Sequence, residues 1–236
     1  MRPLPPVRSW RLIVFDLDGT LVDSRRDIAD AANALLESCG IARLPEEHIG
    51  RMVGDGAATL VARAFQARRV EPPADALDRF VTLYHDRLLD HTRPYPGMIE
   101  TLEALRRRAR LAVLTNKPRR ATLAILEGLD LAQFFTPAMV VAGDGPFPRK
   151  PDPSGLRHLQ TAAVADADAT LLVGDSMIDW RTARAAGTAA CLARYGFGFS
   201  TIAERASISD DHPVDLISTC DVRLINSPDE LLDIVL

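Results

Sequence analysis

Short apolar runs alternate with amphipathic segments along most of the chain. Runs without polar interruption are typical of strands that are buried on both faces of a parallel sheet, and they predict strands at residues 12–15, 111–115, 138–143, 170–174, 188–193 and 222–225. Apolar residues at helical spacing predict helices over residues 98–109, 119–128, 153–164, 178–186 and 228–236. Strands and helices in this alternation indicate an α/β fold with a doubly wound, mostly parallel, Rossmann-like sheet.

Residues 23–92 interrupt this alternation, because only helical periodicity is found there. It predicts helices over residues 23–37 and 57–67, a helix start at Pro45, and one longer helix marked by apolar residues from Leu77 to Leu89. We therefore expect residues 23–92 to be a helical insert of a size that can fold as its own unit. Residues 1–22 and 93–236 would then form the α/β core.

Composition narrows the possible functions. With 236 residues, 47% of them hydrophobic, the chain is long enough to bury a core in one or two domains. A net charge of -4 argues against a basic surface for nucleic acid or anionic membranes, and leaves a small or phosphorylated ligand open. No apolar run approaches the ~18 residues of a membrane span, and residues 1–6 lack the layout of a signal peptide. We expect a cytoplasmic protein.

The three cysteines do not indicate a disulfide framework or a zinc site. Cys39, Cys191 and Cys220 are odd in number, far apart and without metal-ligand spacing. We expect them to be buried small hydrophobic residues in a reducing compartment.

Candidate chemistry begins directly after the first predicted strand. Asp16 and Asp18 stand one residue apart before Gly19, at the strand end where open α/β sheets bind their ligands. Two carboxylates this close repel each other unless they share a cation or a proton. The pair therefore indicates either a divalent metal or a carboxyl group with a raised pKa for acid–base work.

Three further strand ends or loops carry similar residues. Thr115 and Asn116 precede a helix start that suits an anion, and Lys150 stands before a proline from which its ammonium could reach a phosphate. Asp175 and Asp179 are one helical turn apart and suit a hard cation. Each could instead be a turn former, a helix cap or a solvated charge. Because four such endings follow in order along one edge of one predicted sheet, we interpret them as one site.

With these motifs in order, the sequence resembles the phosphatases of the haloacid dehalogenase superfamily over nearly its whole length. The resemblance identifies residues 15–20 as the first motif, Thr115 as the second, Lys150 as the third, and residues 174–176 with Asp179 as the fourth. Residues 23–92 are placed like the family's α-helical cap. Within the superfamily, residues 53–56, 95–97, 115–118 and 184–187 look most like those of phosphoglycolate phosphatases.

The resemblance implies a mechanism with two different aspartates. Asp16 would attack phosphorus and form an aspartyl-phosphate, and Asp18 would protonate the leaving oxygen and then deprotonate the hydrolytic water. Mg²⁺ would be held by the Asp16 carboxylate, the Asp18 backbone carbonyl and Asp175, with Asp179 supporting it directly or through water.

The remaining motif residues would hold the phosphate. Thr115, Asn116 and Lys150 would bind and neutralise its oxygens. The cap would close over a small phosphorylated metabolite, most simply 2-phosphoglycolate. Its carboxylate could be received by backbone N–H groups at the helix start from Gly54 to Ala57, Gly56 included, or by Arg51, which could equally be a solvated charge.

Other functions remain possible on the same sequence. A phosphomutase or a pyrophosphate hydrolase would differ mainly in cap residues, and a non-catalytic protein could bind a ligand or partner through the cap. The residues Asp16, Asp18, Lys150 and Asp175 argue against the non-catalytic alternative, because loss of any one would be its signature. Either a monomer or a homodimer is compatible with the sequence.

Overall fold

A parallel six-stranded sheet forms the centre of the computed structural model, which describes residues 9–200, 202 and 222–235. Its strands lie in the order β5 (Val140–Val141), β4 (Arg110–Leu114), β1 (Leu12–Phe15), β6 (Thr170–Gly174), β7 (Ala189–Ala193) and β8 (Val222–Ile225). Thus β1 lies between β4 and β6, where the order of the chain reverses. Ligands of open α/β sheets bind beyond the carboxyl ends of the strands at such a point. The predicted fold class is confirmed.

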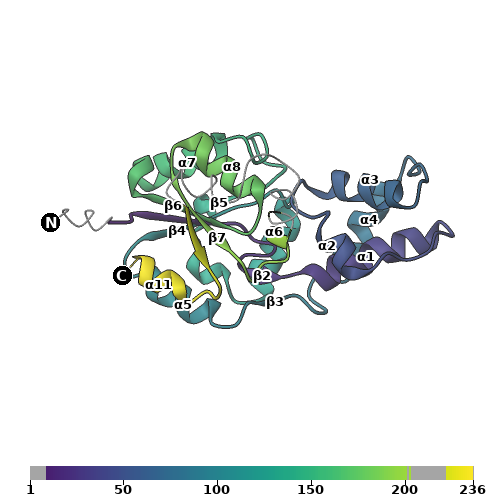
Figure 1. The fold of residues 1–236 in the computed structure, drawn as a ribbon, viewed down its shortest axis with the longest axis horizontal. Helices are drawn as coiled ribbons and strands as arrows, with labels where there is room; N and C mark the ends of the chain where they lie inside the picture. The colour runs from purple at the N-terminus through teal and green to yellow at the C-terminus, as the bar shows by residue number, and fades with distance from the viewer. Residues whose placement is uncertain (1–8, 201, 203–221, 236) are drawn as a thin grey trace.

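Helices cover both faces of this sheet (Figure 1). One face carries α5 (Met98–Leu105), α6 (Arg119–Gly128) and α11 (Glu230–Val235), and the other carries α7 (Ser154–Ala163) and α8 (Met177–Ala186). Successive residues of β1 point to opposite faces, so Ile13 and Phe15 enter one hydrophobic core while Leu12 and Val14 enter the other. Burial on both faces explains why this strand has no polar position.

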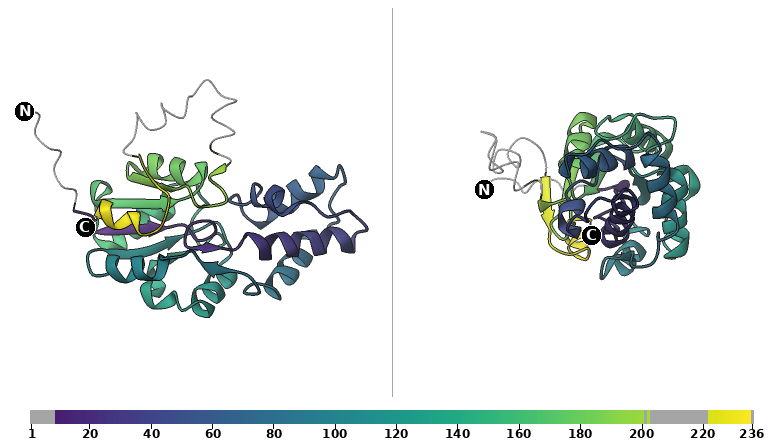
Figure 2. Two further views of the ribbon diagram at one scale, coloured as in Figure 1. Left: turned by 60° about the horizontal axis from the view of Figure 1, so that its bottom comes forward. Right: turned by 90° about the vertical axis from the view of Figure 1, so that its right-hand side faces the viewer.

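Four helices pack on one another at one end of the molecule, beyond the edge of the sheet (Figures 1 and 2). They are α1 (Arg25–Ser38), α2 (Glu46–Gly50), α3 (Ala57–Ala67) and α4 (Ala76–His85). The chain enters this helical unit through β2 (Val22–Asp23) and leaves it through β3 (Arg93–Pro94), which pair antiparallel. The domain boundaries set at residues 23 and 92 stay a prediction.

Two buried polar side chains fix the loops of the helical unit. On α1, the carboxylate of Asp27 accepts hydrogen bonds from the backbone N–H groups of His91 and Thr92 and from the Thr92 hydroxyl, at 2.6–3.0 Å. Asn33 accepts from the N–H of Leu44 at 2.7 Å and donates to its carbonyl at 3.0 Å. Asp27 thereby ties the start of the helical unit to the segment through which the chain leaves it.

Some element ends differ from the sequence-based predictions. The longer helix expected to reach Leu89 ends at His85, and Leu88 is buried from a turn instead, since the chain must reach Asp27 by residue 91. The strand expected over residues 138–143 contains only two residues, because Pro137 starts a 3₁₀ turn just before it. The short β2 and β3 strands were not predicted.

The remaining expectations can be placed briefly. Within the described part of the chain, no helix is long and apolar enough to cross a membrane. Cys191 is buried and Cys39 is half-buried, and burial raises the pKa of the Cys191 thiol to about 12. Cys220 lies outside the described residues.

Candidate active site

Three neighbouring strands bring polar residues to one edge of the sheet. Asp16 follows β1, Thr115 follows β4 and Asp175 follows β6. Because these strands are parallel and adjacent, their carboxyl ends meet at the same edge. All three side chains are buried. The structure therefore brings together residues that are far apart in the sequence.

Asp16, Asp175 and Asp179 form a cluster of buried carboxylates. Each offers an oxygen, and these oxygens all lie within 4.8 Å of one another. Asp179 belongs to the first turn of α8, where its Oδ2 accepts hydrogen bonds from the backbone N–H and the hydroxyl of Ser176 at 3.1 and 2.6 Å. Ser176 caps the helix in return, so this capping box fixes the Asp179 carboxylate.

Lys150 is the cation of this cluster. Its Nζ lies 2.9 Å from Asp16 Oδ1 and 2.6 Å from Asp179 Oδ1. Its backbone is held by Asn116, whose Oδ1 accepts from the Lys150 N–H at 2.8 Å and whose Nδ2 donates to the Lys150 carbonyl at 3.0 Å. Since an ammonium has three hydrogens, one remains for a ligand.

The charges of the cluster do not balance. Burial raises the pKa of Asp16 to about 6, with Lys150 opposing this shift and Asp179 adding to it. Burial, Asp179 and Asp16 in turn raise the pKa of Asp175 well above its usual range. Burial alone would lower the pKa of Lys150, but Asp16 and Asp179 outweigh it, so the pKa is raised and the ammonium stays charged. Three carboxyl groups thus share one protein cation.

These residues fit a divalent metal ion. Carboxylate oxygens are the ligands that hard cations prefer, and one divalent charge would offset the excess of acids around Lys150. Asp175 is fixed by the Gly198 N–H, which donates to its Oδ2 at 2.8 Å. Gly19 passes so close that a Cβ there would lie 1.9 Å from Asp175 Oδ2, and its φ of +82° favours glycine in any case.

Asp18 has different surroundings from Asp16. Its Oδ1 accepts from the Ser24 hydroxyl at 2.5 Å, and Lys117 Nζ donates to both of its oxygens at 2.9 and 3.0 Å. The same ammonium donates to the Tyr84 hydroxyl at 2.6 Å and lies 4.5 Å from the centre of the Tyr84 ring. Each aspartate of the first motif therefore has its own lysine.

Lys117 and Tyr84 are residues that the sequence analysis did not assign to the site. Lys117 lies in residues 115–118, a segment already singled out for its resemblance, and a second buried ammonium could have been proposed from it. Tyr84 falls within the apolar periodicity from Leu77 to Leu89, which predicts a helix and nothing more. Burial would lower the pKa of Lys117, but Asp18 and Tyr84 outweigh it and the pKa is raised. Burial raises the pKa of the Tyr84 hydroxyl, which stays protonated.

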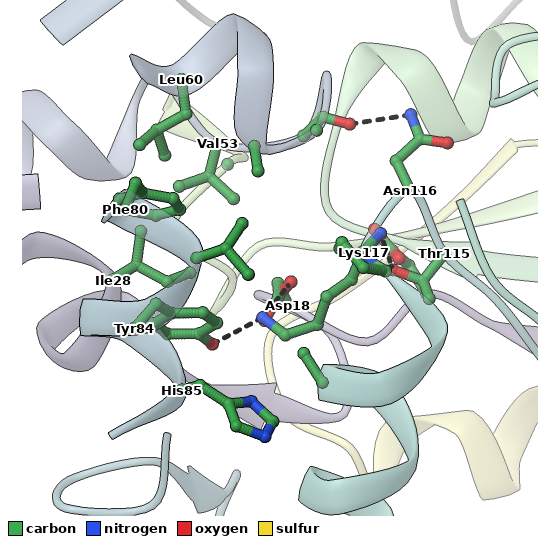
Figure 3. A pocket seen from close by; sticks show the side chains of 18 of the residues that line it. Asp18, Ile28, Val53, Leu60, Phe80, Tyr84, His85, Thr115, Asn116 and Lys117 are labelled. Carbon is green, nitrogen blue, oxygen red and sulfur yellow. Dashed lines mark hydrogen bonds and ion pairs between the residues drawn. The ribbon is translucent and has the colours of Figure 1, made fainter. Parts of the chain in front are cut away.

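A cavity of about 270 Å³ lies between the strand ends and the helical unit. Asp16, Asp18 and Thr115 line its floor. On the side of the helical unit, the wall includes the apolar residues Ile28, Val53, Leu60 and Phe80 together with polar ones such as Tyr84 and His85. Figure 3 shows Lys117 extending across this space from the side of Thr115 to the hydroxyl of Tyr84.

The loop between α2 and α3 reaches this cavity only in part. Gly54 and Gly56 line it, and the Gly54 carbonyl accepts a hydrogen bond from Asn116 Nδ2 at 2.9 Å. Arg51 is exposed and lines a separate groove with Asp55. Of the three residues expected to set specificity, the structure thus brings two glycines, and not Arg51, to the cavity.

Comparison with known proteins adds an independent observation. A family model described as haloacid dehalogenase-like hydrolase matches residues 13–193. The chain is 42% identical over 209 residues to a phosphoglycolate phosphatase of Rhodospirillum rubrum, covering 84% of this chain and 86% of that protein. It is 40% identical over 190 residues to a plasmid phosphoglycolate phosphatase of Cupriavidus necator, covering 78% of this chain and 81% of that one.

A solved structure agrees with these relatives. The crystal structure of a predicted phosphoglycolate phosphatase from Haemophilus somnus superposes with a TM-score of 0.84 at 29% sequence identity. The match covers 97% of this chain and 99% of the other. The similarity thus extends through both the sheet and the helical unit.

Proposed function

The chain belongs to the haloacid dehalogenase-like hydrolases, and from this premise we propose that it hydrolyses 2-phosphoglycolate with Mg²⁺ through an aspartyl-phosphate on Asp16. That it is a phosphatase of this type, acting on a small phosphorylated compound, follows from its relatives. The observation that carries the finer proposal is the pairing of Asp16 with Lys150 beside two further buried aspartates.

Asp16 is the proposed nucleophile. Its Oδ1 accepts hydrogen bonds from the Leu17 N–H at 2.7 Å and from Lys150 at 2.9 Å, which fixes the orientation of the carboxylate. Oδ2 accepts no hydrogen bond from the described residues and is left to attack phosphorus. The new oxygen–phosphorus bond would form as the bond to the leaving oxygen breaks.

Three groups can hold the phosphate oxygens during this step. Lys150 has one ammonium hydrogen that its two carboxylate partners do not use. Thr115 Oγ1 accepts from the Lys117 N–H at 3.2 Å, and its own hydrogen is available to a ligand. Asn116 spends its side chain on Gly54 and Lys150, so we propose that its backbone N–H is the group that binds phosphate.

Asp18 is the proposed acid and base. It would give a proton to the leaving oxygen and then take one from the water that attacks the phosphorylated Asp16. The water oxygen would bond to phosphorus while the bond to Asp16 breaks, which returns both carboxyl groups to their starting states. Ser24 and Lys117 hold the Asp18 carboxylate in place for both transfers.

A divalent ion would be held by the Asp16 and Asp175 carboxylates and the Asp18 backbone carbonyl, with Asp179 supporting it directly or through water. When bound, Mg²⁺ would lower the repulsion between the anionic nucleophile and the anionic phosphate. The helical unit, residues 23–92, would act as a cap whose apolar wall excludes water from the phosphorylated enzyme.

Substitution of the nucleophile tests the mechanism. Asp16→Asn is expected to lower 2-phosphoglycolate hydrolysis by at least about 10⁴-fold while the circular dichroism spectrum is kept. Asp168→Asn, at an exposed acid remote from the site, is the control and should retain full activity. Near-normal turnover by Asp16→Asn would sink the nucleophile assignment.

Metal removal and a substrate panel test the remaining parts. Chelation should remove activity and Mg²⁺ should restore it, whereas hydrolysis that is indifferent to chelation would contradict the metal site.

Sugar phosphates and pyrophosphate should be poorer substrates than 2-phosphoglycolate. A clear preference for one of them would replace the proposed substrate without removing the phosphatase chemistry.

A further inference from the structure

The cavity has a second polar end that the proposed phosphate site does not use. The Lys117 ammonium and the Tyr84 hydroxyl meet away from Thr115, on the side of the helical unit, and both side chains are buried (Figure 3). We infer that these two side chains receive a carboxylate that the substrate carries next to its phosphate ester, and so select short acidic phosphomonoesters. This inference rests on the proposed function and names the groups that recognise the organic part of the substrate.

The position of Lys117 follows from its contact with Asp18. In the proposed mechanism Asp18 must reach the leaving oxygen, and Lys117 Nζ lies 2.9 Å from Asp18 Oδ1. The ammonium is therefore beside the leaving oxygen, on the side of the helical unit, because it also contacts Tyr84. In 2-phosphoglycolate a single methylene separates the leaving oxygen from the carboxyl group. The carboxylate is therefore close enough to that oxygen to meet an ammonium that lies beside it.

The hydrogen bonds leave room for such a ligand. Lys117 donates twice to the same carboxylate, so one donor can move to a second anion while Asp18 keeps the other. The Tyr84 oxygen accepts from Lys117, and its own hydrogen donates to no acceptor among the described residues. One ammonium and one hydroxyl thus present two donors to the same point.

The rest of the cavity wall favours this assignment over a polyhydroxylated substrate. The side chains of Ile28, Val53, Leu60 and Phe80 offer no hydrogen bond. Of the other polar side chains that α4 and its end bring to the cavity, Thr82 and Asp86 are exposed and His85 is half-buried. Arg120 also lines the cavity, but it is exposed, and an exposed cation is screened by solvent. A few placed polar groups in an apolar pocket are what fix the orientation of a small ligand.

A matched pair of substrates tests the inference. Ethyl phosphate has a methyl group where 2-phosphoglycolate has its carboxylate, and the two share the phosphate ester. We expect the wild type to prefer 2-phosphoglycolate in kcat/KM. Lys117→Met should reduce that preference by about 100-fold, and Tyr84→Phe by about 10-fold, because each removes a donor to a buried charge. Tyr95→Phe, at a ring that packs on Tyr195, is the control and should keep the preference.

Each outcome bears on a different statement. If Lys117→Met and Tyr84→Phe slow both substrates by the same factor, the pair only positions Asp18 and the carboxylate assignment is overturned. If the preference survives in both variants, another group binds the carboxylate. If the wild type hydrolyses ethyl phosphate but shows no preference for 2-phosphoglycolate, the proposed substrate fails instead. Tyr84→Phe keeps its ring in the core, so the inference can be tested even if Lys117→Met does not fold. As a second measurement, glycolate should inhibit ethyl phosphate hydrolysis less in Tyr84→Phe than in the wild type.

Discussion

Two buried lysines serve the two aspartates of one short segment, and they differ in where their other partner lies. Lys150 pairs with Asp16 and with Asp179, both of which belong to the α/β core. Lys117 pairs with Asp18 and with Tyr84, which belongs to α4 of the helical unit. The first ion pair needs only the core, whereas the second is completed by contact between the core and the helical unit.

The difference separates chemistry common to many phosphate esters from recognition of one of them. Lys150 pairs with the proposed nucleophile and with a proposed support of the metal, so its contribution should not depend on what the ester carries. In the proposed binding mode Lys117 and Tyr84 would face the organic part, so their contribution should depend on the substrate. Four substitutions test this division, and we give them from the largest expected effect to the smallest.

Lys150→Met should have the largest effect. It removes the charge that faces the phosphate and leaves the surrounding carboxylates without their protein cation, so kcat should fall by about 10³-fold. The loss should be similar for 2-phosphoglycolate and ethyl phosphate, in contrast to Lys117→Met. Steady-state kinetics with both substrates measures it, and a strongly substrate-dependent loss would erase the distinction between the two lysines.

Asn116→Ala should affect stability and activity together. The side chain holds the backbone of Lys150 and the carbonyl of Gly54, so we expect about 2–3 kcal/mol of lost stability and a kcat about 10–100-fold lower as Lys150 shifts. Asn33→Ala is a matched control, because Asn33 is also buried and bonds the backbone of Leu44 in both directions.

Denaturant unfolding and steady-state kinetics together separate the two asparagines. Both variants should lose stability, and only Asn116→Ala should lose kcat. Equal kinetic defects in the two would mean that Asn116 has no special role in placing Lys150.

Asp27→Asn should act on stability with little change in kcat. An amide cannot accept all the hydrogen bonds that the carboxylate takes from His91 and Thr92, and we expect a loss of about 2 kcal/mol. Asp30→Asn is the control on the same helix, since its partners Arg26 and Arg43 are exposed. An unfolding midpoint in urea that does not change for Asp27→Asn would show that this contact is not needed to hold the helical unit.

Arg51→Gln should have the smallest effect. Arg51 is exposed in a groove outside the cavity, so KM for 2-phosphoglycolate should stay within about 2-fold of the wild type. The comparison with Lys117→Met then shows which cation recognises the substrate. A KM raised by an order of magnitude would mean that Arg51 reaches the ligand after all.

The sequence was sufficient to predict the sheet and the position of the acids. Strands buried on both faces have uninterrupted apolar residues, and parallel strands must place their carboxyl ends at one edge, so Asp16, Thr115 and Asp175 could be brought together on paper. The roles proposed for them stay predictions that the experiments above address.

The contacts between core and helical unit could not be predicted in the same way. Tyr84 follows the apolar periodicity of α4, and nothing local shows that its hydroxyl meets Lys117 from the core. Strands β2 and β3 are each two residues long, which is too short for an alternating pattern, and β3 contains Pro94. Such contacts depend on how the helical unit packs on the core, and local sequence patterns do not predict that packing.

The central position of β1 in the sheet has a consequence for how the protein folds during synthesis. Leu12 pairs with Arg110 on one side and with Thr170 on the other, so β1, which is synthesised before the other described strands, can be enclosed only after residue 170 has been made. Pairings between such distant residues form slowly. The helical unit, whose contacts are closer in sequence, can fold during that wait, and we expect Asp16, the proposed nucleophile, to be among the last groups to reach its final environment.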